Sequence, residues 1–255
     1  MARQSTGELR VMPITGIGEI HPGDALAEKI MAALRHSKIA LRQGDILVVT
    51  HKIVSKAEGQ LRSLSQVRPS NRARSFAQRH GLDPRLVELA LAESRRIVRM
   101  RRGILITETA HGLVCANSGV DLSNVDGGRT AVLLPRDPDR SAAALRRELR
   151  EKLGLRIPIV IADTFGRPWR EGLCEVAIGV AGMSPFRDFR GRQDPYGYPL
   201  KVTLEATADD LACAAGLVCG KLSRVPACII RGFRHAAGSG RAADMIRPAS
   251  RDLFR

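Results

Sequence analysis

Aromatic residues are scarce in this chain of 255 residues, where they make up 4% of the composition. With so few rings, the sequence favours no extended surface for stacking nucleic-acid bases. Long hydrophobic runs are also missing, because no stretch approaches the roughly 20 apolar residues of a membrane helix. The first six residues lack the apolar stretch of a signal peptide. We therefore expect a cytoplasmic protein that does not bind membranes.

Cysteines are few and irregularly placed. There are five, an odd number, and no two are spaced as C-x-x-C. This argues against a disulfide framework and against a structural zinc site. We expect reduced thiols, most of them buried. They are Cys115, Cys174, Cys213, Cys219 and Cys228.

The familiar nucleotide signatures are absent. Gly16 and Gly18 have their third glycine only at Gly23, too late for the dinucleotide pattern, and the run 216–221 is one residue short of a Walker loop. The chain also contains no H-E-x-x-H and no G-x-S-x-G motif. We expect neither a Rossmann nor a Walker-type fold, and a hydrolase has little support.

Apolar and basic residues are plentiful. The apolar fraction of 44% is enough for a sizeable core, and 41 Lys and Arg against 26 Asp and Glu give a formal charge of +15. Such a charge attracts phosphates, nucleic acid or other polyanions. Arginine enrichment on solvated faces explains much of it equally well. A basic nucleic-acid-binding module, although disfavoured, therefore stays as the alternative from another class.

Hydrophobic periodicity predicts interleaved strands and helices without an internal repeat. This pattern is typical of an α/β fold or a mixed α+β fold with mixed sheets, with boundaries near residues 70 and 200 if the single unit divides. We expect Asp24 to cap the first helix, and the segment 117–129 is too polar for the core. Predicted helices are 24–36, 70–80, 83–94, 141–153 and 208–221. Predicted strands are 9–14, 45–50, 97–101, 104–108, 113–116, 131–134, 158–162, 175–180, 201–205 and 227–231.

Three polar clusters, at 51–56, 117–124 and 163–170, each follow an apolar strand. Ligand sites of α/β proteins lie at such strand ends, so the three clusters are expected to converge in one cleft. In the first cluster, Lys52 and Lys56 are suited to neutralise a polyphosphate. The alternative is a solvated basic edge.

The other two clusters carry Asp121 and Asp163, flanked by the side-chain oxygens of Ser123, Asn124 and Thr164. Ligand sets made of oxygen suit hard cations such as magnesium or manganese, which commonly bind substrate phosphates as well. Aspartates in such loops are also common turn-formers and caps, so this alternative stays open.

The third cluster also contains Arg167 and Arg170, which flank Pro168 and Trp169. A planar guanidinium can hold a carboxylate or a phosphate by two parallel hydrogen bonds. The alternative interpretation is that Trp169 anchors the core while the arginines are exposed.

Along nearly its whole length the chain resembles the coenzyme F-420-0:L-glutamate ligases, also called the γ-glutamyl ligases of coenzyme F-420. The D-T-F-G-R-P-W-R run at 163–170 is highly specific by itself. The matching stretches are 44–48, 53–59, 114–124, 134–139, 162–170, 176–182 and 194–197.

The resemblance implies a GTP-dependent ligase that joins the lactyl carboxylate of the deazaflavin to the amine of L-glutamate. An acyl phosphate would form first, GDP and phosphate would be released, and further γ-linked glutamates are an option. It also implies two divalent cations, Mg or Mn, and allows a monovalent cation such as K. The implied protein is a homodimer with a two-domain γ-glutamyl ligase fold. A related ligase acting on another carboxylate or amino acid stays open.

The resemblance also implies roles for individual residues. Lys221 stands where the family is expected to place a Gln or Glu that helps to bind the second metal, and Glu175 where an Asp or Asn is usual. An ammonium cannot ligate a cation, so either the second metal is lost or Lys221 contacts phosphate instead. The implied metal ligands are Asp121, Asp163 and Thr164. The implied GTP contacts are Ile17, Gly18, Glu19, Ile20, His51, Lys52, Lys56 and Asn124, with Gly220 and Lys221 in the segment 217–224. The candidate catalytic residues are Lys56, Asp121, Asp163, Arg167 and Arg170.

Overall fold

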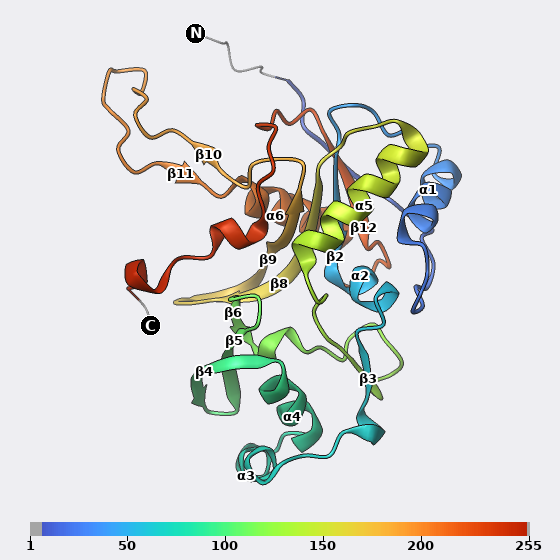
Figure 1. Cartoon of the computed structure of the whole chain (residues 1–255), viewed down its shortest axis with the longest axis vertical. Helices are drawn as coiled ribbons and strands as arrows, with labels where there is room; N and C mark the ends of the chain where they lie inside the picture. The colour runs from blue at the N-terminus through green and yellow to red at the C-terminus, as the bar shows by residue number, and fades with distance from the viewer. Residues whose placement is uncertain (1–6, 254–255) are drawn as a thin grey trace.

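The computed structural model describes residues 7–253 and is built around a five-stranded sheet with the order β1-β12-β2-β8-β9 (Figure 1). β2 and β8 run parallel, and the other neighbours are antiparallel. The first six residues, where we expect no signal peptide, lie outside the described residues. The strands span Arg10–Pro13 (β1), Ala227–Arg231 (β12), Ile46–Thr50 (β2), Ile159–Arg167 (β8) and Arg170–Ala181 (β9).

Helices cover both faces of this sheet. Leu47 and Val49 of β2 pack with the core on the side of α1 and α5, while Ile46 and Val48 pack with the core on the side of α6. A strand buried on both faces needs apolar residues at every position, which explains the unbroken apolar run of β2. The helices span Leu26–His36 (α1), Pro138–Leu153 (α5) and Thr207–Cys219 (α6).

The segment between β2 and α5 forms the lower part of the molecule in Figure 1. A three-stranded sheet of the order β4-β5-β6 and a two-stranded sheet of β3 and β7 lie there with α3 and α4. The elements are α2 His51–Ala57, β3 Leu61–Ser63, η1 Leu64–Gln66, α3 Asn71–His80, α4 Pro84–Ala92, β4 Ser94–Arg101, β5 Ile104–Thr109, β6 Val114–Ala116, η2 Asn117–Gly119 and β7 Thr130–Val132.

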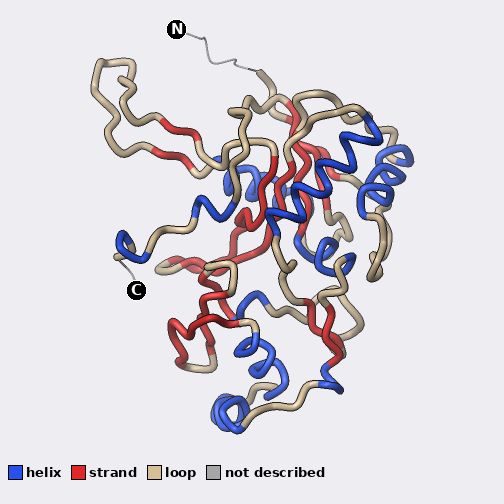
Figure 2. Tube along the Cα trace, in the orientation of Figure 1, coloured by secondary structure: helices blue, strands red, loops and turns tan. Residues whose placement is uncertain are grey.

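A long hairpin and a short tail complete the chain. β10 (Arg187–Asp188) pairs with β11 (Leu204–Glu205), and the long loop between them projects from the body in Figure 2. After β12 come the short helices η3 (Ala242–Met245) and η4 (Ala249–Arg251).

The mixed α/β class is confirmed, but two local predictions near the first helix and β2 are wrong. No helix is predicted for residues 51–59, yet α2 begins at His51, and Lys56 is buried within it. Asp24 does not cap α1, because the N-cap is Ala25 and the Asp24 carboxylate instead accepts the backbone N–H of His21 at 2.8 Å.

Further along the chain, several segments also differ from the prediction. No strand is predicted for 164–172, yet this segment continues the β8–β9 hairpin. The helix predicted over 141–153 starts earlier, at Pro138, because Asp137 caps α5. α6 ends at Cys219, so Lys221 lies beyond the helix. Ser118 is buried within the polar segment 117–129, where its side chain hydrogen-bonds Thr107 and donates to the backbone oxygen of Ala90.

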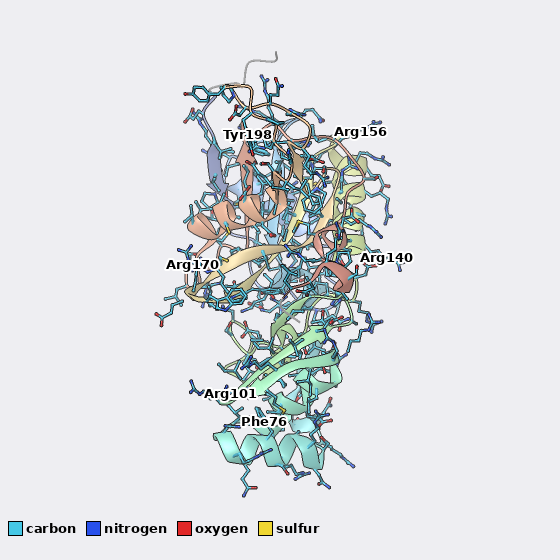
Figure 3. The ribbon with its side chains drawn as sticks, turned by 90° about the vertical axis from the view of Figure 1, so that its left-hand side faces the viewer. Phe76, Arg101, Arg140, Arg156, Arg170 and Tyr198 are labelled. Carbon is cyan, nitrogen blue, oxygen red and sulfur yellow. The ribbon has the colours of Figure 1, made fainter. Side chains whose placement is uncertain are left out.

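The cysteines and arginines behave as their sequence pattern indicates. All five cysteines are free thiols, and Cys115, Cys219 and Cys228 are buried. In Figure 3 Arg101 and Arg170 project outward from the ribbon, in agreement with their exposed surfaces. Within residues 7–253, every helix is too short or too polar to cross a membrane.

Candidate functional site

The first two residues of α2 hold aspartates from two distant segments. His51 Nε2 lies 3.1 Å from Asp163 Oδ1, and Lys52 Nζ lies 2.6 Å from Asp121 Oδ2. The parallel register of β2 and β8 pairs Thr50 with Ala162. The next residue of each segment, His51 and Asp163, therefore lies beside the other. The structure therefore brings all three polar clusters together.

One turn further along α2, Lys56 joins the same site as a buried ammonium. Its Nζ lies 2.5 Å from Oε1 of Glu19 and donates to the backbone oxygen of Asn124 at 2.9 Å. Lys56 is only 7% exposed, whereas the Glu19 side chain is 62% exposed. Glu19 is thus the part of this ion pair that solvent or a ligand can reach.

Asp121 is an ionised carboxylate at neutral pH. Its two oxygens accept the backbone N–H of Ser123 at 2.7 Å and the Ser123 hydroxyl at 2.9 Å. Burial opposes ionisation, but the hydrogen bond from Lys52 and the Ser123 N–H outweigh it, so the pKa of Asp121 lies below its usual range. The carboxylate is suited to pairing with a cation.

A second group of oxygens lies beside Asp163 and includes Glu175. The sequence alone assigns no role to Glu175. The Thr164 hydroxyl donates to Glu175 Oε1 at 2.7 Å, and the Thr164 N–H donates to Asp163 Oδ1 at 2.7 Å. Lys221 Nζ lies 2.9 Å from Glu175 Oε1 and also contacts the Thr164 hydroxyl. Gly220, with φ of 58°, turns the chain between the end of α6 and Lys221.

Cys115 lies close to Asp163 but is not a candidate nucleophile. Burial, together with the negative charge of Asp163, raises the pKa of the Cys115 thiol to about 12. The thiolate is the reactive form of cysteine, so Cys115 is an unreactive neighbour.

The two arginines of the third cluster lie apart from this centre. Arg167 Nη2 donates to the backbone oxygen of Glu171 across the tip of the β8–β9 hairpin. Four residues separate Arg167 from Asp163, which along a strand is about 13 Å. Trp169 is 80% exposed, so the alternative that it anchors the core is wrong.

The candidate metal ligands are of the right chemical class for a hard cation. Asp121, Asp163 and Thr164 offer carboxylate and hydroxyl oxygens, and basic side chains now contact all three. Within residues 7–253 there is no group of three or more His, Cys, Asp or Glu side chains arranged to hold a metal. A cation here would therefore depend on oxygens from other groups, such as a hydroxyl or a substrate phosphate.

This fold and site define a mixed α/β protein with a cluster of charged side chains where the parallel pairing of β2 and β8 ends. Residues 16–232 match the family model described as F420-0:Gamma-glutamyl ligase, and the chain belongs to that family. It is 45% identical to the Coenzyme F420:L-glutamate ligase of Methanothermobacter thermautotrophicus, over 97% of this chain and 99% of the relative.

Two further relatives carry the same name. The chain is 46% identical to the Coenzyme F420:L-glutamate ligase of Methanopyrus kandleri, over 97% of this chain and 98% of the relative. It is 38% identical to the protein of that name from Archaeoglobus fulgidus, over 97% of this chain and 96% of the relative. These full-length matches confirm the family that the sequence motifs indicate.

Proposed function

We propose that this protein is a GTP-dependent ligase that joins L-glutamate to the deazaflavin coenzyme F-420, starting from its glutamate-free form F-420-0. The names of the full-length relatives support the reaction class. The observation that carries the proposal is the convergence of Lys52 and Lys56 with Asp121 and Asp163 at the end of β2. Phosphoryl transfer needs this combination of fixed positive charge and cation-binding oxygens.

Lys52 and Lys56 would bind the phosphates of GTP. Each ammonium is paired with a carboxylate, Asp121 or Glu19, that a phosphate oxygen can replace. This exchange keeps the buried Lys56 paired throughout, which matters because an unpaired buried charge is costly. The segment Ile17, Gly18, Glu19 and Ile20, together with His51, Asn124 and Gly220, would line the rest of the nucleotide.

The reaction would proceed in two steps. The acceptor carboxylate attacks the terminal phosphorus of GTP, the bond from this phosphorus to the bridging oxygen breaks, and GDP leaves as the acyl phosphate forms. The amine of glutamate then attacks the acyl carbon, and the amide forms as phosphate and a proton are released. Holding the reactants in line accounts for much of the rate gained in such reactions.

Asp121, Asp163 and Thr164 would hold a divalent cation, Mg or Mn, which would supply positive charge to the phosphate oxygens. Lys221 limits the number of such ions, because its ammonium already lies against Thr164 and Glu175. We therefore propose one divalent cation on the Asp121–Asp163 side and a phosphate contact for Lys221 on the other. A fixed ammonium supplies one positive charge without depending on metal concentration.

Two further assignments rest on exposed features. Arg167 and Arg170, at the tip of the β8–β9 hairpin, would meet a substrate carboxylate or phosphate only when the ligand reaches that tip.

The β10–β11 hairpin projects from the body and carries three exposed side chains. The exposed fractions are 96% for Tyr196, 65% for Tyr198 and 86% for Val202. An apolar projection of this kind is typical of a contact between subunits and supports a homodimer.

A coupled assay for GDP release tests the function directly. GDP should form only when GTP, a divalent cation, L-glutamate and glutamate-free deazaflavin are all present, and mass spectrometry should show the acceptor heavier by one glutamyl group. Absence of both signals would contradict the proposal. A panel of other carboxylates and amino acids tests the related-ligase alternative, and steeply salt-dependent nucleic-acid binding without GDP release would favour a basic binding module.

A further inference from the structure

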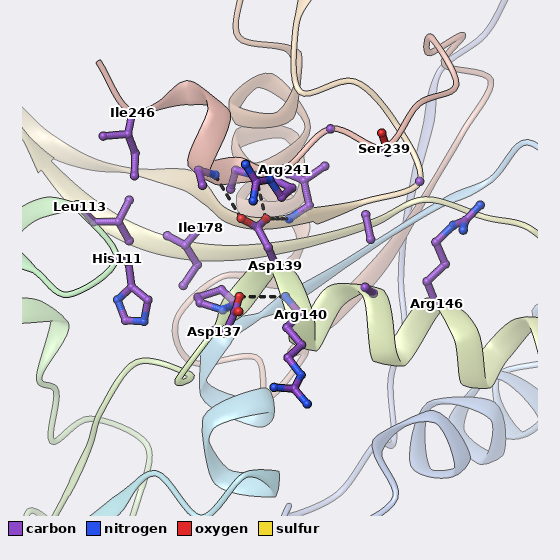
Figure 4. A pocket seen from close by; sticks show the side chains of 18 of the residues that line it. His111, Leu113, Asp137, Asp139, Arg140, Arg146, Ile178, Ser239, Arg241 and Ile246 are labelled. Atoms are coloured by element: carbon purple, nitrogen blue, oxygen red, sulfur yellow. Dashed lines mark hydrogen bonds between the residues drawn. The ribbon is translucent and has the colours of Figure 1, made fainter. Parts of the chain in front are cut away.

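A cavity of about 810 Å³ lies beside the α5 N-terminus, apart from the lysines of the candidate site. It is bounded by α5, the β5–β6 turn, the edge strand β9 and the segment 238–246 (Figure 4). Leu113, Ile178 and Ile246 form an apolar wall, visible on the left of Figure 4. Its volume lies within the range of small-molecule sites and far exceeds what one glutamate fills.

Arginines dominate the polar lining, and the two acidic residues are already engaged. Asp139 accepts the backbone N–H groups of Val180 at 2.8 Å and Ala242 at 2.7 Å, which ties the edge strand to η3. Asp137 caps α5 by accepting the backbone N–H of Arg140 at 3.0 Å. Asp139 therefore stabilises the fold through both of its oxygens, and Asp137 does so through Oδ1.

Several guanidinium groups on the walls are available to an anion. Arg136 precedes α5, and Arg140 and Arg146 lie on that helix. Arg241 lies on the opposite wall, where its Nη2 pairs with Asp244 at 3.2 Å. Within residues 7–253, no acceptor is paired with the guanidinium of Arg136 or Arg140. Arg146 uses only its Nε, which donates to the backbone oxygen of Ile157. The chemistry of the cavity suits a ligand with several carboxylates.

The cavity adjoins the reaction centre along the β8–β9 hairpin. Ile178 is the extra residue of a bulge in β9, opposite Ile161 and Ala162, and the next residue of β8 is Asp163. Leu113, also in the cavity wall, directly precedes β6, and Cys115 of this strand lies close to Asp163. The apolar wall of the cavity and Asp163 are therefore close neighbours along one hairpin, which is why we assign both to the same acceptor.

We propose that the cavity binds the γ-glutamyl chain of an acceptor that already carries glutamate, so that the product of one round is held for the next. This inference rests on the proposed function. Each glutamyl residue of such a chain carries a free carboxylate, which matches the arginines, and its methylene groups match the apolar wall. The cavity thus serves chain extension, while the first addition depends on the centre at Asp121 and Asp163.

The test compares the double variant Arg136→Gln/Arg140→Gln with Arg150→Gln, an exposed arginine of α5 outside the cavity lining. Mass spectrometry follows the first and later glutamate additions. We expect the double variant to slow later additions roughly ten-fold, as for lost hydrogen bonds to charged groups, and the first addition less than two-fold. Arg150→Gln should leave both unchanged.

Calorimetry with γ-linked triglutamate provides a readout that does not need turnover. The double variant should bind this probe roughly ten-fold more weakly than the parent and Arg150→Gln. Equal loss of first and later additions, a parent that adds a single glutamate, or unchanged triglutamate binding would each overturn the inference. A parent that adds no glutamate at all contradicts the proposed function, and the triglutamate titration still decides whether the cavity binds such chains.

Discussion

His51 Nε2 lies 3.1 Å from Oδ1 of Asp163, which connects the first residue of α2 to the middle of β8. The next residue, Lys52, forms the matching contact with Asp121. Two consecutive residues therefore set the positions of both candidate metal-binding carboxylates. The pairing also shows why α2 has to begin immediately after β2, since a longer connection would carry the imidazole and the ammonium away from their partners.

Replacing either carboxylate by its amide should stop the reaction. We expect Asp121→Asn and Asp163→Asn each to reduce GDP release by at least about a hundred-fold at saturating metal, because each removes negative charge from a proposed cation ligand. Circular dichroism should show the fold unchanged. Asp210→Asn, an exposed aspartate in the first turn of α6, is the control and should retain full activity. Near-parental rates in the two site variants would remove these residues from the reaction.

The ion pair between Lys56 and Glu19 predicts opposite effects for its two members. Lys56→Ala should weaken GTP binding or slow phosphoryl transfer by roughly ten-fold or more, because a charged phosphate contact is lost. Glu19→Gln should instead tighten GTP binding, because it removes the carboxylate that competes with phosphate for Lys56. Calorimetric titration with GTP measures both. If Glu19→Gln binds GTP more weakly, Glu19 contacts the nucleotide directly and does not compete with phosphate for Lys56.

Lys221 predicts a change in metal dependence. If its ammonium holds a phosphate oxygen beside Thr164 and Glu175, Lys221→Gln should need several times more divalent metal for half-maximal GDP release. Binding of Mn²⁺ in the presence of GDP, measured by electron paramagnetic resonance, should also change in stoichiometry or affinity. Lys201→Gln, an exposed lysine near β11, is the control. Superimposable metal titrations of Lys221→Gln and the parent would show that Lys221 is a surface residue.

The lowered pKa of Asp121 predicts a pH-dependent contribution to stability. In an unfolded chain the pKa of aspartate is about 3.9, and in the folded protein that of Asp121 is lower. Ionised Asp121 therefore stabilises the fold fully above the unfolded pKa, and this contribution is lost as the pH falls through the folded pKa. Urea unfolding of the parent and Asp121→Asn should show a difference at neutral pH that shrinks under acid. In a Lys52→Met background this pH dependence should largely disappear.

The sequence alone determined the parts of this protein that depend on local patterns. The apolar runs of β2 and β8 identify strands buried on both faces, and a polar cluster follows or ends each of them. The run 163–170 indicates the family, which the matched relatives confirm. Lys52, Lys56, Asp121 and Asp163 could be selected as candidates because charged residues next to buried strands have few purely structural roles.

The tertiary structure decided which of these side chains meet. The pairs His51–Asp163 and Lys221–Glu175 depend on the register of strands and on helix ends that are far apart in sequence, and local periodicity carries no information about register. The same holds for the cavity, whose walls come from four separate elements. Arg167 belongs to the same sequence motif as Asp163. It nevertheless lies far from Asp163, because both are in β8 and an extended strand advances about 3.3 Å per residue.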